Sequence, residues 1–194
     1  MHVRAVRLVV IAVVLAGCDA DTAPQPAHTP APAPQVTVAP TLPVTASAAA
    51  AGAVSCADVI GTVPAPRPEL TVIEDAVAVP AATGTSKPLQ VSADNDAGTG
   101  AKLFTKNGLV VRRRAEVRLR VLEPAAGRAW IGWGSPGVPG PQAVVDGCDA
   151  SGAWIAFAGG YWVRSPMCVP VGVRVAGGVE HRVSIAVGAP CPAP

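Results

Sequence analysis

Apolar and polar residues alternate along several short segments in the second half of the chain. The segment 115–122, AEVRLRVL, alternates Ala, Val and Leu with Glu and Arg. The segments 169–175 and 179–187, on either side of Gly177-Gly178, alternate in the same way with valine and isoleucine. A period of two places successive side chains on opposite faces of a β-strand. The pattern therefore predicts strands with one buried face each, and a hairpin that turns at Gly177-Gly178.

Two other dipeptides lie between apolar runs and predict further hairpins. Asn107-Gly108 separates LFTK from LVV, and both central residues of a two-residue hairpin turn need a positive φ, which Asn and Gly tolerate. Gly159-Gly160 separates AWIAFA from YWV in the same way. No segment after Cys56 shows a helical period over eleven residues. Many short strands with Gly and Pro between them are typical of all-β domains, and we expect one antiparallel β-sandwich.

The first eighteen residues have the pattern of an export signal. Arg4 and Arg7 precede an apolar run from Leu8 to Val14. This run is shorter than the about 20 residues that a transmembrane helix needs. Small residues follow in the stretch LAGC, which ends at Cys18. A charged start, a short apolar core and small residues at the end indicate a secretory signal that is cleaved.

The stretch LAGC resembles the lipobox of bacterial lipoprotein signal peptides. The resemblance implies that residues 1–17 are removed and that Cys18 becomes the first residue, with a diacylglyceryl group on its thiol. Two acyl chains satisfy the requirement for stable membrane anchoring. The alternative is an ordinary secretory signal that Cys18 follows by chance. The resemblance implies a protein held by lipid on the extracytoplasmic face of the cell membrane.

The residues after this cysteine have the composition of a tether. Residues 19–54 are rich in Pro, Ala and Thr and contain no aromatic residue, so they bury too little apolar surface to offset the entropy of ordering. We expect the lipidated cysteine and a disordered tether over 18–54, and one disulfide-bonded domain over 55–194. At about 3.1 Å per residue, an extended tether of this length spans on the order of 100 Å.

Four cysteines remain for the domain once the lipobox cysteine is assigned to the anchor. In an oxidising compartment they pair, and four cysteines allow three pairings. A turn at Gly159-Gly160 brings Cys148 near Cys168 at the open end of the hairpin, which leaves Cys56 to pair with Cys191. The separation between Cys148 and Cys168 is too short for the inter-sheet bridge of a true immunoglobulin domain, so we expect only an immunoglobulin-like architecture. Structural zinc is the alternative, but no two of the four have the close C-x₂₋₄-C spacing of such sites.

Charge and histidine content exclude two classes of function. Basic residues number 15 against 13 acidic residues, and two of the basic residues lie in the signal. The mature chain therefore lacks the basic excess of a nucleic-acid-binding domain. His181 is the only histidine after the tether, which excludes a metal site built on two or three histidines. We expect neither a metal nor a cofactor.

The sequence contains no recognisable catalytic set. A G-x-S-x-G nucleophile motif is absent. The segment 94–98, DNDAG, has the opening of a calcium loop, but the twelfth position is Thr105 instead of glutamate, so a polar turn is the simpler interpretation. The glutamates form no recognisable acid–base pair. We expect a protein that is not an enzyme, and the alternative class is an envelope hydrolase whose carboxylates the sequence does not identify.

A run of arginines is the first candidate for a binding surface. If no bulge intervenes, the segment RRRAEVRLR places Arg112, Arg114, Arg118 and Arg120 on one strand face. This basic stripe is suited to anionic lipid head groups or wall phosphates. The alternative is an ordinary solvated strand face.

A cluster of aromatic residues is the second candidate. Its members lie between residues 130 and 162 and offer flat apolar faces to sugar rings: Trp130, Trp133, Trp154, Tyr161 and Trp162. The alternative is that they fill the core of a domain poor in Phe and Leu. Trp133, beside the loop GSPGVPGPQ, is expected to be the most exposed, and Tyr161 and Trp162 are expected to point to opposite faces of their strand.

The C-terminal segment 156–192, from AFAGGYWV to GAPCP, is similar to the tails of uncharacterised secreted lipoproteins of high-GC actinobacteria. This resemblance implies the anchor and the fold, and it implies no activity. We expect a lipid-anchored cell-envelope protein that presents its β-sandwich as a binding or structural module. The expected partner is a protein or an envelope glycan, contacted through Trp133 and Trp162 with help from Arg118 and Arg120.

Overall fold

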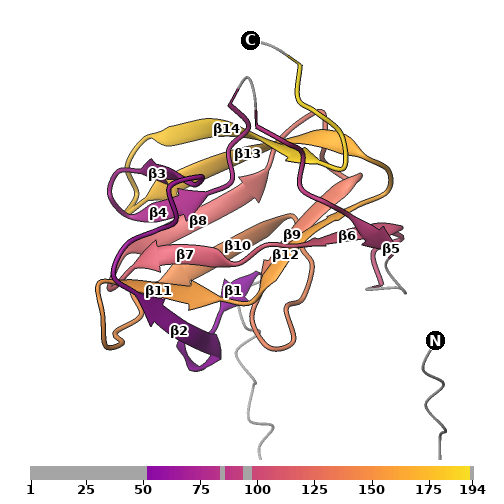
Figure 1. Ribbon diagram of the computed structural model, residues 1–194. Coiled ribbons are helices and arrows are strands. Elements are labelled where there is room, and N and C mark those ends of the chain that lie inside the picture. Colours follow the sequence, from indigo (N-terminus) through magenta and orange to yellow (C-terminus); the bar gives the residue numbers. More distant parts are fainter. Residues whose placement is uncertain (1–51, 84–85, 94–97, 193–194) are drawn as a thin grey trace, which may run out of the picture. The chain divides into compact units, whose positions relative to one another are not determined.

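The computed structural model describes residues 52–83, 86–93 and 98–192. The predicted signal peptide, Cys18, the tether as far as residue 51 and most of the calcium-loop candidate lie outside these residues. The described residues form fourteen β-strands and one short 3₁₀ helix, Cys56–Asp58, so the all-β prediction is confirmed (Figure 1). The first strand begins at Ala53, two residues before the predicted start of the domain at Ser55.

The strands form three hydrogen-bonded sheets. Sheet A has the spatial order β1 (Ala53–Val54), β10 (Gln142–Asp146), β8 (Glu116–Val121), β13 (Met167–Val175) and β14 (Glu180–Val187). Sheet B has the order β2 (Val59–Val63), β11 (Trp154–Phe157), β7 (Leu109–Arg112), β4 (Val77–Val79) and β3 (Thr71–Ile73). Sheet C has the order β5 (Ser92–Ala93), β6 (Leu103–Lys106), β12 (Gly159–Val163) and β9 (Ala129–Trp133).

Sheets B and C are two halves of one bent sheet. The strand pair β7–β11 of sheet B and the strand pair β6–β12 of sheet C have the same antiparallel register, from Arg112 opposite Trp154 to Leu103 opposite Val163. Between them the backbone N–H of Asn107 donates to the carbonyl of Gly159 at 2.9 Å. Each chain segment therefore crosses the bend without reversing, and sheets B and C share two long strands.

This continuity shows that two of the three predicted hairpins are wrong. Asn107-Gly108 joins β6 to β7, and Gly159-Gly160 opens β12 directly after β11, but neither dipeptide reverses the chain. The glycines at the bend allow close packing instead. A β-carbon on Gly159 would lie 2.1 Å from the carbonyl oxygen of Gly132, and one on Gly160 would lie 1.9 Å from that of Thr105.

The third predicted hairpin is confirmed. β13 and β14 pair antiparallel from Met167 opposite Val187 to Arg174 opposite Glu180, and the chain turns between Ala176 and Val179. The predicted alternation in β8 is also confirmed, because its apolar residues are buried and its charged residues are exposed. Sheet A thus turns one apolar face inward and one charged face outward.

One apolar core fills the sandwich between sheet A and the bent sheet. Its fully buried members come from all three sheets and include Leu119, Val145, Val173, Ile155, Phe157, Ile131 and Tyr161. Most are β-branched, as expected for residues packed on pleated surfaces. This core holds the outer face of sheet A in place.

All four cysteines of the domain form disulfides, but the predicted pairing is wrong. Cys56 pairs with Cys148 and Cys168 pairs with Cys191. The prediction depended on a hairpin at Gly159-Gly160, and without that turn β11 and β12 do not bring Cys148 to Cys168. The first bridge joins the 3₁₀ helix before β2 of sheet B to the segment after β10 of sheet A. The second bridge attaches the C-terminal segment to β13.

Candidate functional site

The aromatic residues predicted to contact a glycan are not available at the surface. Trp133 is only 4% exposed, so the prediction that it is the most exposed of the cluster is wrong. Its indole N–H donates to the carbonyl of Asn107 at 2.8 Å, and its ring meets the edge of Tyr161 at 5.7 Å. Trp133 therefore packs against the inner side of the bend between sheets B and C.

Trp162 and Trp130 lie on the outer face of sheet C, where neighbours cover them. Trp162 is 7% exposed, and its ring packs on that of Phe104 at 4.5 Å between centroids. Tyr161 lies in the core, so the predicted divergence of Tyr161 and Trp162 is confirmed. Arg164 lies over the ring of Trp130, 5.6 Å from its centroid. A sugar would have to displace these contacts before it could stack on Trp162.

The predicted basic stripe is divided between two sheets. Arg112 lies on β7 of sheet B, where it forms an ion pair with Asp75 and covers the ring of Trp154. Arg114 has a positive φ of 65°, which turns the chain before β8. Only Arg118 and Arg120 share a strand face, because this turn separates them from the two earlier arginines.

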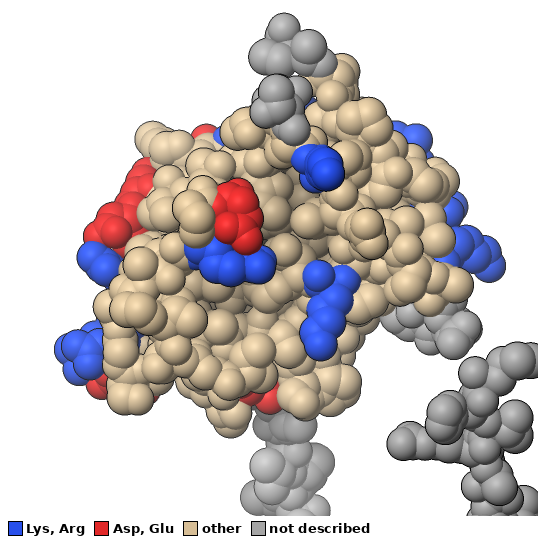
Figure 2. All heavy atoms as spheres, in the orientation of Figure 1, with Lys and Arg blue, Asp and Glu red and all other residues tan. Residues whose placement is uncertain are grey.

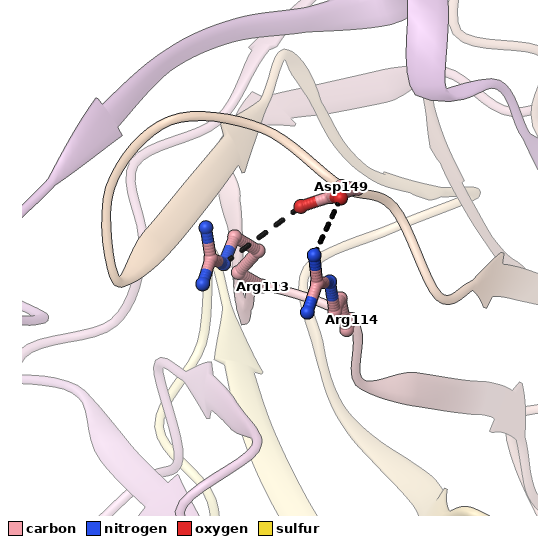
Figure 3. A network of polar contacts seen from close by, with 3 residues as sticks. All are labelled: Arg113, Arg114 and Asp149. Atoms are coloured by element: carbon pink, nitrogen blue, oxygen red, sulfur yellow. Dashed lines mark hydrogen bonds and ion pairs between the residues drawn. The ribbon is translucent and has the colours of Figure 1, made fainter.

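Arg113 and Arg114 bind the same carboxylate and fasten a loop. Asp149 lies between the two guanidinium groups, with Nη2 of Arg114 at 2.7 Å and Nε of Arg113 at 3.8 Å (Figure 3). The hydrogen bond from Arg114 lowers the pKa of Asp149. The backbone N–H of Arg114 also donates to the carbonyl of Cys148 at 2.8 Å. These arginines hold the loop that carries the Cys56–Cys148 bridge, and they share one carboxylate.

The outer face of sheet A has a different arrangement of charge. Arg118 on β8 lies directly opposite Arg174 on β13, and we call these residues the arginine pair. Both side chains are exposed, and neither makes a hydrogen bond or a close ion pair with another residue in the described part of the chain. Like charges directly opposite each other on neighbouring strands destabilise a sheet. The arginine pair is therefore a position where an anion would relieve repulsion.

Arg120 beside this pair is neutralised by a carboxylate. Its Nε and Nη2 donate to the two carboxylate oxygens of Glu180 at 2.6 Å each. Gly172 lies on β13, between the strands that carry Arg120 and Glu180. It makes room for their ion pair, because a β-carbon there would lie 2.7 Å from Cδ of Glu180. The hydrogen bond from Arg120 lowers the pKa of Glu180, and the charge of Arg174 contributes in the same direction. Arg120 therefore shapes the surface next to the arginine pair and does not itself have a free charge.

Two carboxylates face each other in the next row of the same surface. Glu116 on β8 lies directly opposite Asp146 on β10, and we call these residues the acidic pair. Both are exposed, and the structure places no basic side chain of the described residues in an ion pair with them. Sheet A thus carries one pair of like negative charges and one pair of like positive charges side by side.

The two charged pairs line one hollow. Its volume is about 250 Å³, and Val144, Ala176 and Gly177 also line it. A second hollow of about 180 Å³ lies on the other side of the arginine pair, beside Arg120 and Glu180. Both hollows are open to solvent and smaller than the roughly 300–1,000 Å³ of drug-sized sites, so they suit a charged group of a larger ligand.

Charged side chains are sparse on the face of the domain that Figure 2 draws. Figure 2 shows a surface that is mostly uncharged, with several basic side chains in contact with acidic ones. His181 also has a partner, because its Nε2 lies 2.5 Å from Oε1 of Glu74, in the turn between β3 and β4. This contact joins sheet A to the β3–β4 turn of sheet B and gives His181 a structural position.

Sequence reasoning identified Arg118 but did not identify Arg174, Glu116 or Asp146 as its neighbours. Arg174 lies in the alternating segment VGVRVAGG, which assigns it to the outer face of its strand. The strand order was needed to place it opposite Arg118. Among residues 52–83, 86–93 and 98–192, no three His, Cys, Asp or Glu side chains gather as metal ligands would.

Comparison of the sequence with protein-family models and with curated proteins found no match. Within the residues that the structure describes, no helix is long and apolar enough to cross a bilayer. The candidate site is therefore defined by the geometry of sheet A alone.

Proposed function

We propose that this protein is a lipid-anchored binding module of the cell envelope, and that it binds a phosphate-bearing envelope glycan through the arginine pair on sheet A. The observation that carries the proposal is the direct opposition of Arg118 and Arg174 without a carboxylate between them. The role is binding instead of catalysis, because the residues around the arginine pair form an open surface without a nucleophile and its base.

The chemistry of arginine supports an oxyanion as the ligand. Each guanidinium offers several N–H donors in a planar fork that matches phosphate or carboxylate geometry. The two forks start from adjacent strands, with β-carbons about 5 Å apart, so one phosphate is within reach of both. Because the site is exposed, salt screens the attraction and a single contact is weak. A polymer with many phosphates compensates for weak contacts by rebinding, which raises the effective concentration at the site.

The lipobox supports the location of this module. A lipid on Cys18 and a tether of about 100 Å would hold the domain among envelope polymers and let the open face of sheet A reach them. Replacing Cys18 with Ser removes the thiol that carries the lipid, so the chain is expected to move from the membrane fraction to the soluble fraction. A Cys18→Ser chain that still sediments with membranes and partitions into detergent would contradict the anchor.

The binding proposal is tested with the full chain carrying Cys18→Ser. It is incubated with insoluble envelope polymer at low salt, and the retained fraction is measured with and without inorganic pyrophosphate as a competitor. The double variant Arg118→Glu/Arg174→Glu is expected to bind about tenfold more weakly or worse, since a charged hydrogen bond contributes roughly 1.5–3 kcal/mol.

The matched control is Lys102→Glu/Lys106→Glu. Both lysines are exposed; Lys102 directly precedes β6 of sheet C and Lys106 is its last residue, and their reversal changes the net charge by the same amount. The control is expected to bind like the parent chain. Equal loss in both double variants would show a general charge effect, and no retention of the parent chain would remove the proposed function.

A further inference from the structure

The order of charges on sheet A points to the ligand class. Glu116 and Arg118 are two residues apart on β8, so the acidic pair and the arginine pair lie about 7 Å apart along the strand. Val144 on β10 lies opposite Arg118, and Asp146 follows it two residues later. The acidic pair and the arginine pair are therefore neighbours on the same face of sheet A.

The two rows do not neutralise each other. No ion pair joins Glu116 or Asp146 to Arg118 or Arg174 within the described ranges of the chain. A sheet that used these charges only for its own stability would place opposite charges across from each other. Here Glu116 lies opposite Asp146 and Arg118 lies opposite Arg174. The carboxylate on the other side of Arg174 is Glu180, and both of its oxygens already accept from Arg120.

The hollow of about 250 Å³ lies between β10 and the β13–β14 turn, and both the acidic pair and the arginine pair line it. It is lined by Glu116 and Asp146 at one end, by Arg118 and Arg174 at the other, and by Val144 on the β10 side. Gly177 at its margin leaves space, because a β-carbon there would meet nothing within 4 Å. The backbone N–H of Ala176 donates to the carbonyl of Glu116 at 2.9 Å, which attaches the turn to the acidic end.

We infer that this hollow binds a zwitterionic aminoalkyl phosphate group, with the phosphate at the arginine pair and the ammonium at the acidic pair. The inference rests on the proposed function, because it uses the same arginines, and it adds the acidic pair as the element that selects the ligand. An anion without an amine leaves both carboxylates without a counter-ion and is repelled by them. A phosphate and an amine a few bonds apart satisfy all four side chains at once.

The test measures the affinity of small probes for the Cys18→Ser chain by NMR titration of backbone amides at constant ionic strength. The probes are phosphoethanolamine, glycerol 3-phosphate and ethanolamine. Phosphoethanolamine is expected to bind about fivefold more tightly than glycerol 3-phosphate, as two exposed ion pairs allow, and ethanolamine more weakly than either. Its shifts are expected in β8, β10, β13 and the turn at 176–179.

A variant of the acidic pair separates this inference from the proposed function. Glu116→Gln/Asp146→Asn is expected to bind both phosphates equally and glycerol 3-phosphate more tightly than the parent chain does. Asp146→Asn alone is expected to give an intermediate preference, and the amide spectrum away from the hollow reports whether each variant is folded. Equal affinities of the parent chain for the two phosphates would overturn the zwitterion while leaving anion binding intact. Failure of both phosphates to bind would overturn the inference and the proposed function together.

Phosphatidylethanolamine vesicles distinguish the two sources of such a group. The same chain is mixed with these vesicles and, separately, with envelope polymer that carries amine-bearing phosphates. Retention by either source that is reduced, relative to the parent chain, in Glu116→Gln/Asp146→Asn supports the zwitterion site and identifies its source. Retention that this variant leaves unchanged would overturn the role of the acidic pair.

Discussion

The outer faces of sheets A and C are both exposed in part, yet their side chains satisfy each other to different degrees. On sheet C, Phe104 covers Trp162 and Arg164 lies over Trp130. On sheet A, the arginine pair and the acidic pair each place like charges opposite each other. Contacts that are complete within the fold stabilise it and leave little for a ligand. A ligand gains most free energy of binding where charged side chains of the protein lack partners.

The bend between sheets B and C and the outer face of sheet A also differ in what a substitution there would disturb. The bend between sheets B and C depends on backbone segments that approach within van der Waals distance at Gly159 and Gly160. The charged side of sheet A lies on strands whose inner residues already fill the core. We therefore expect substitutions at the bend to change the free energy of unfolding, and substitutions of the outer charges of sheet A to change mainly ligand affinity.

Gly160→Ala is expected to have the largest effect on stability. The new methyl group would lie 1.9 Å from the carbonyl oxygen of Thr105, so β12 and β6 must separate and lose ladder hydrogen bonds. A cost of about 5 kcal/mol or more is expected from so severe a clash. The measurement is the midpoint of urea unfolding, monitored by tryptophan fluorescence.

Gly177→Ala is the control for this prediction. Gly177 has a φ of +74° in an open turn, so alanine adds local backbone strain of about 1–2 kcal/mol without a clash. If the two variants unfold at the same urea concentration, the bend does not depend on close approach of its backbones.

Removal of the two disulfides is expected to have intermediate effects of different size. The Cys56–Cys148 bridge closes 92 residues and the Cys168–Cys191 bridge closes 23. The loop-entropy relation then gives stabilisations of about 4.6 and 3.4 kcal/mol. Cys56→Ala/Cys148→Ala is therefore expected to lower the unfolding midpoint more than Cys168→Ala/Cys191→Ala, because the first bridge closes the longer loop.

A non-reducing peptide map checks the bridges themselves. It is expected to recover Cys56 with Cys148 and Cys168 with Cys191. A peptide that joins Cys56 to Cys191 would contradict the structure, and equal midpoints for the two double variants would contradict the difference in stabilisation.

Glu180→Gln is expected to have the smallest effect, and one that depends on pH. Arg120 lowers the pKa of Glu180 in the folded state, so the ion pair stabilises the fold at pH values above the pKa of an unfolded glutamate. This stabilisation is lost as the pH falls through the lowered folded-state pKa. The Tm of Glu180→Gln is expected to be slightly below that of the parent chain at pH 7, and the difference is expected to vanish in acid.

Glu123→Gln serves as the control, because the side chain of Glu123 is exposed and makes no ion pair in the described part of the chain. High salt is expected to reduce the effect at Glu180, since both partners are partly exposed. A difference in Tm at Glu180 that grows toward low pH would contradict the assigned direction of the pKa change.

Local pattern alone determined several parts of this protein. The alternation in 115–122 predicted β8 and its exposed Arg118, and the residues around Gly177-Gly178 predicted the β13–β14 hairpin. Both are decided within about twenty residues, because the period of a strand and the geometry of a turn are properties of neighbouring residues. The Cys18 lipobox is a signal of the same local kind, and it remains a prediction.

Only the tertiary structure decided the bend, the bridges and the ligand surface. Asn107-Gly108 and Gly159-Gly160 have the composition of turns, but each strand continues because the two segments pair in one register that spans the bend. The paired residues are 42 (Arg112 and Trp154) to 60 (Leu103 and Val163) positions apart in the sequence. In the structure with this long-range pairing, Trp133 is buried at the bend and Cys148 is bonded to Cys56. Arg112 lies on sheet B, whereas Arg118 lies on sheet A. The strand order of sheet A, in which β8 pairs with β13, places Arg174 opposite Arg118. Local preference specifies which residues can turn or extend, whereas the free energy of filling one core specifies which strands become neighbours.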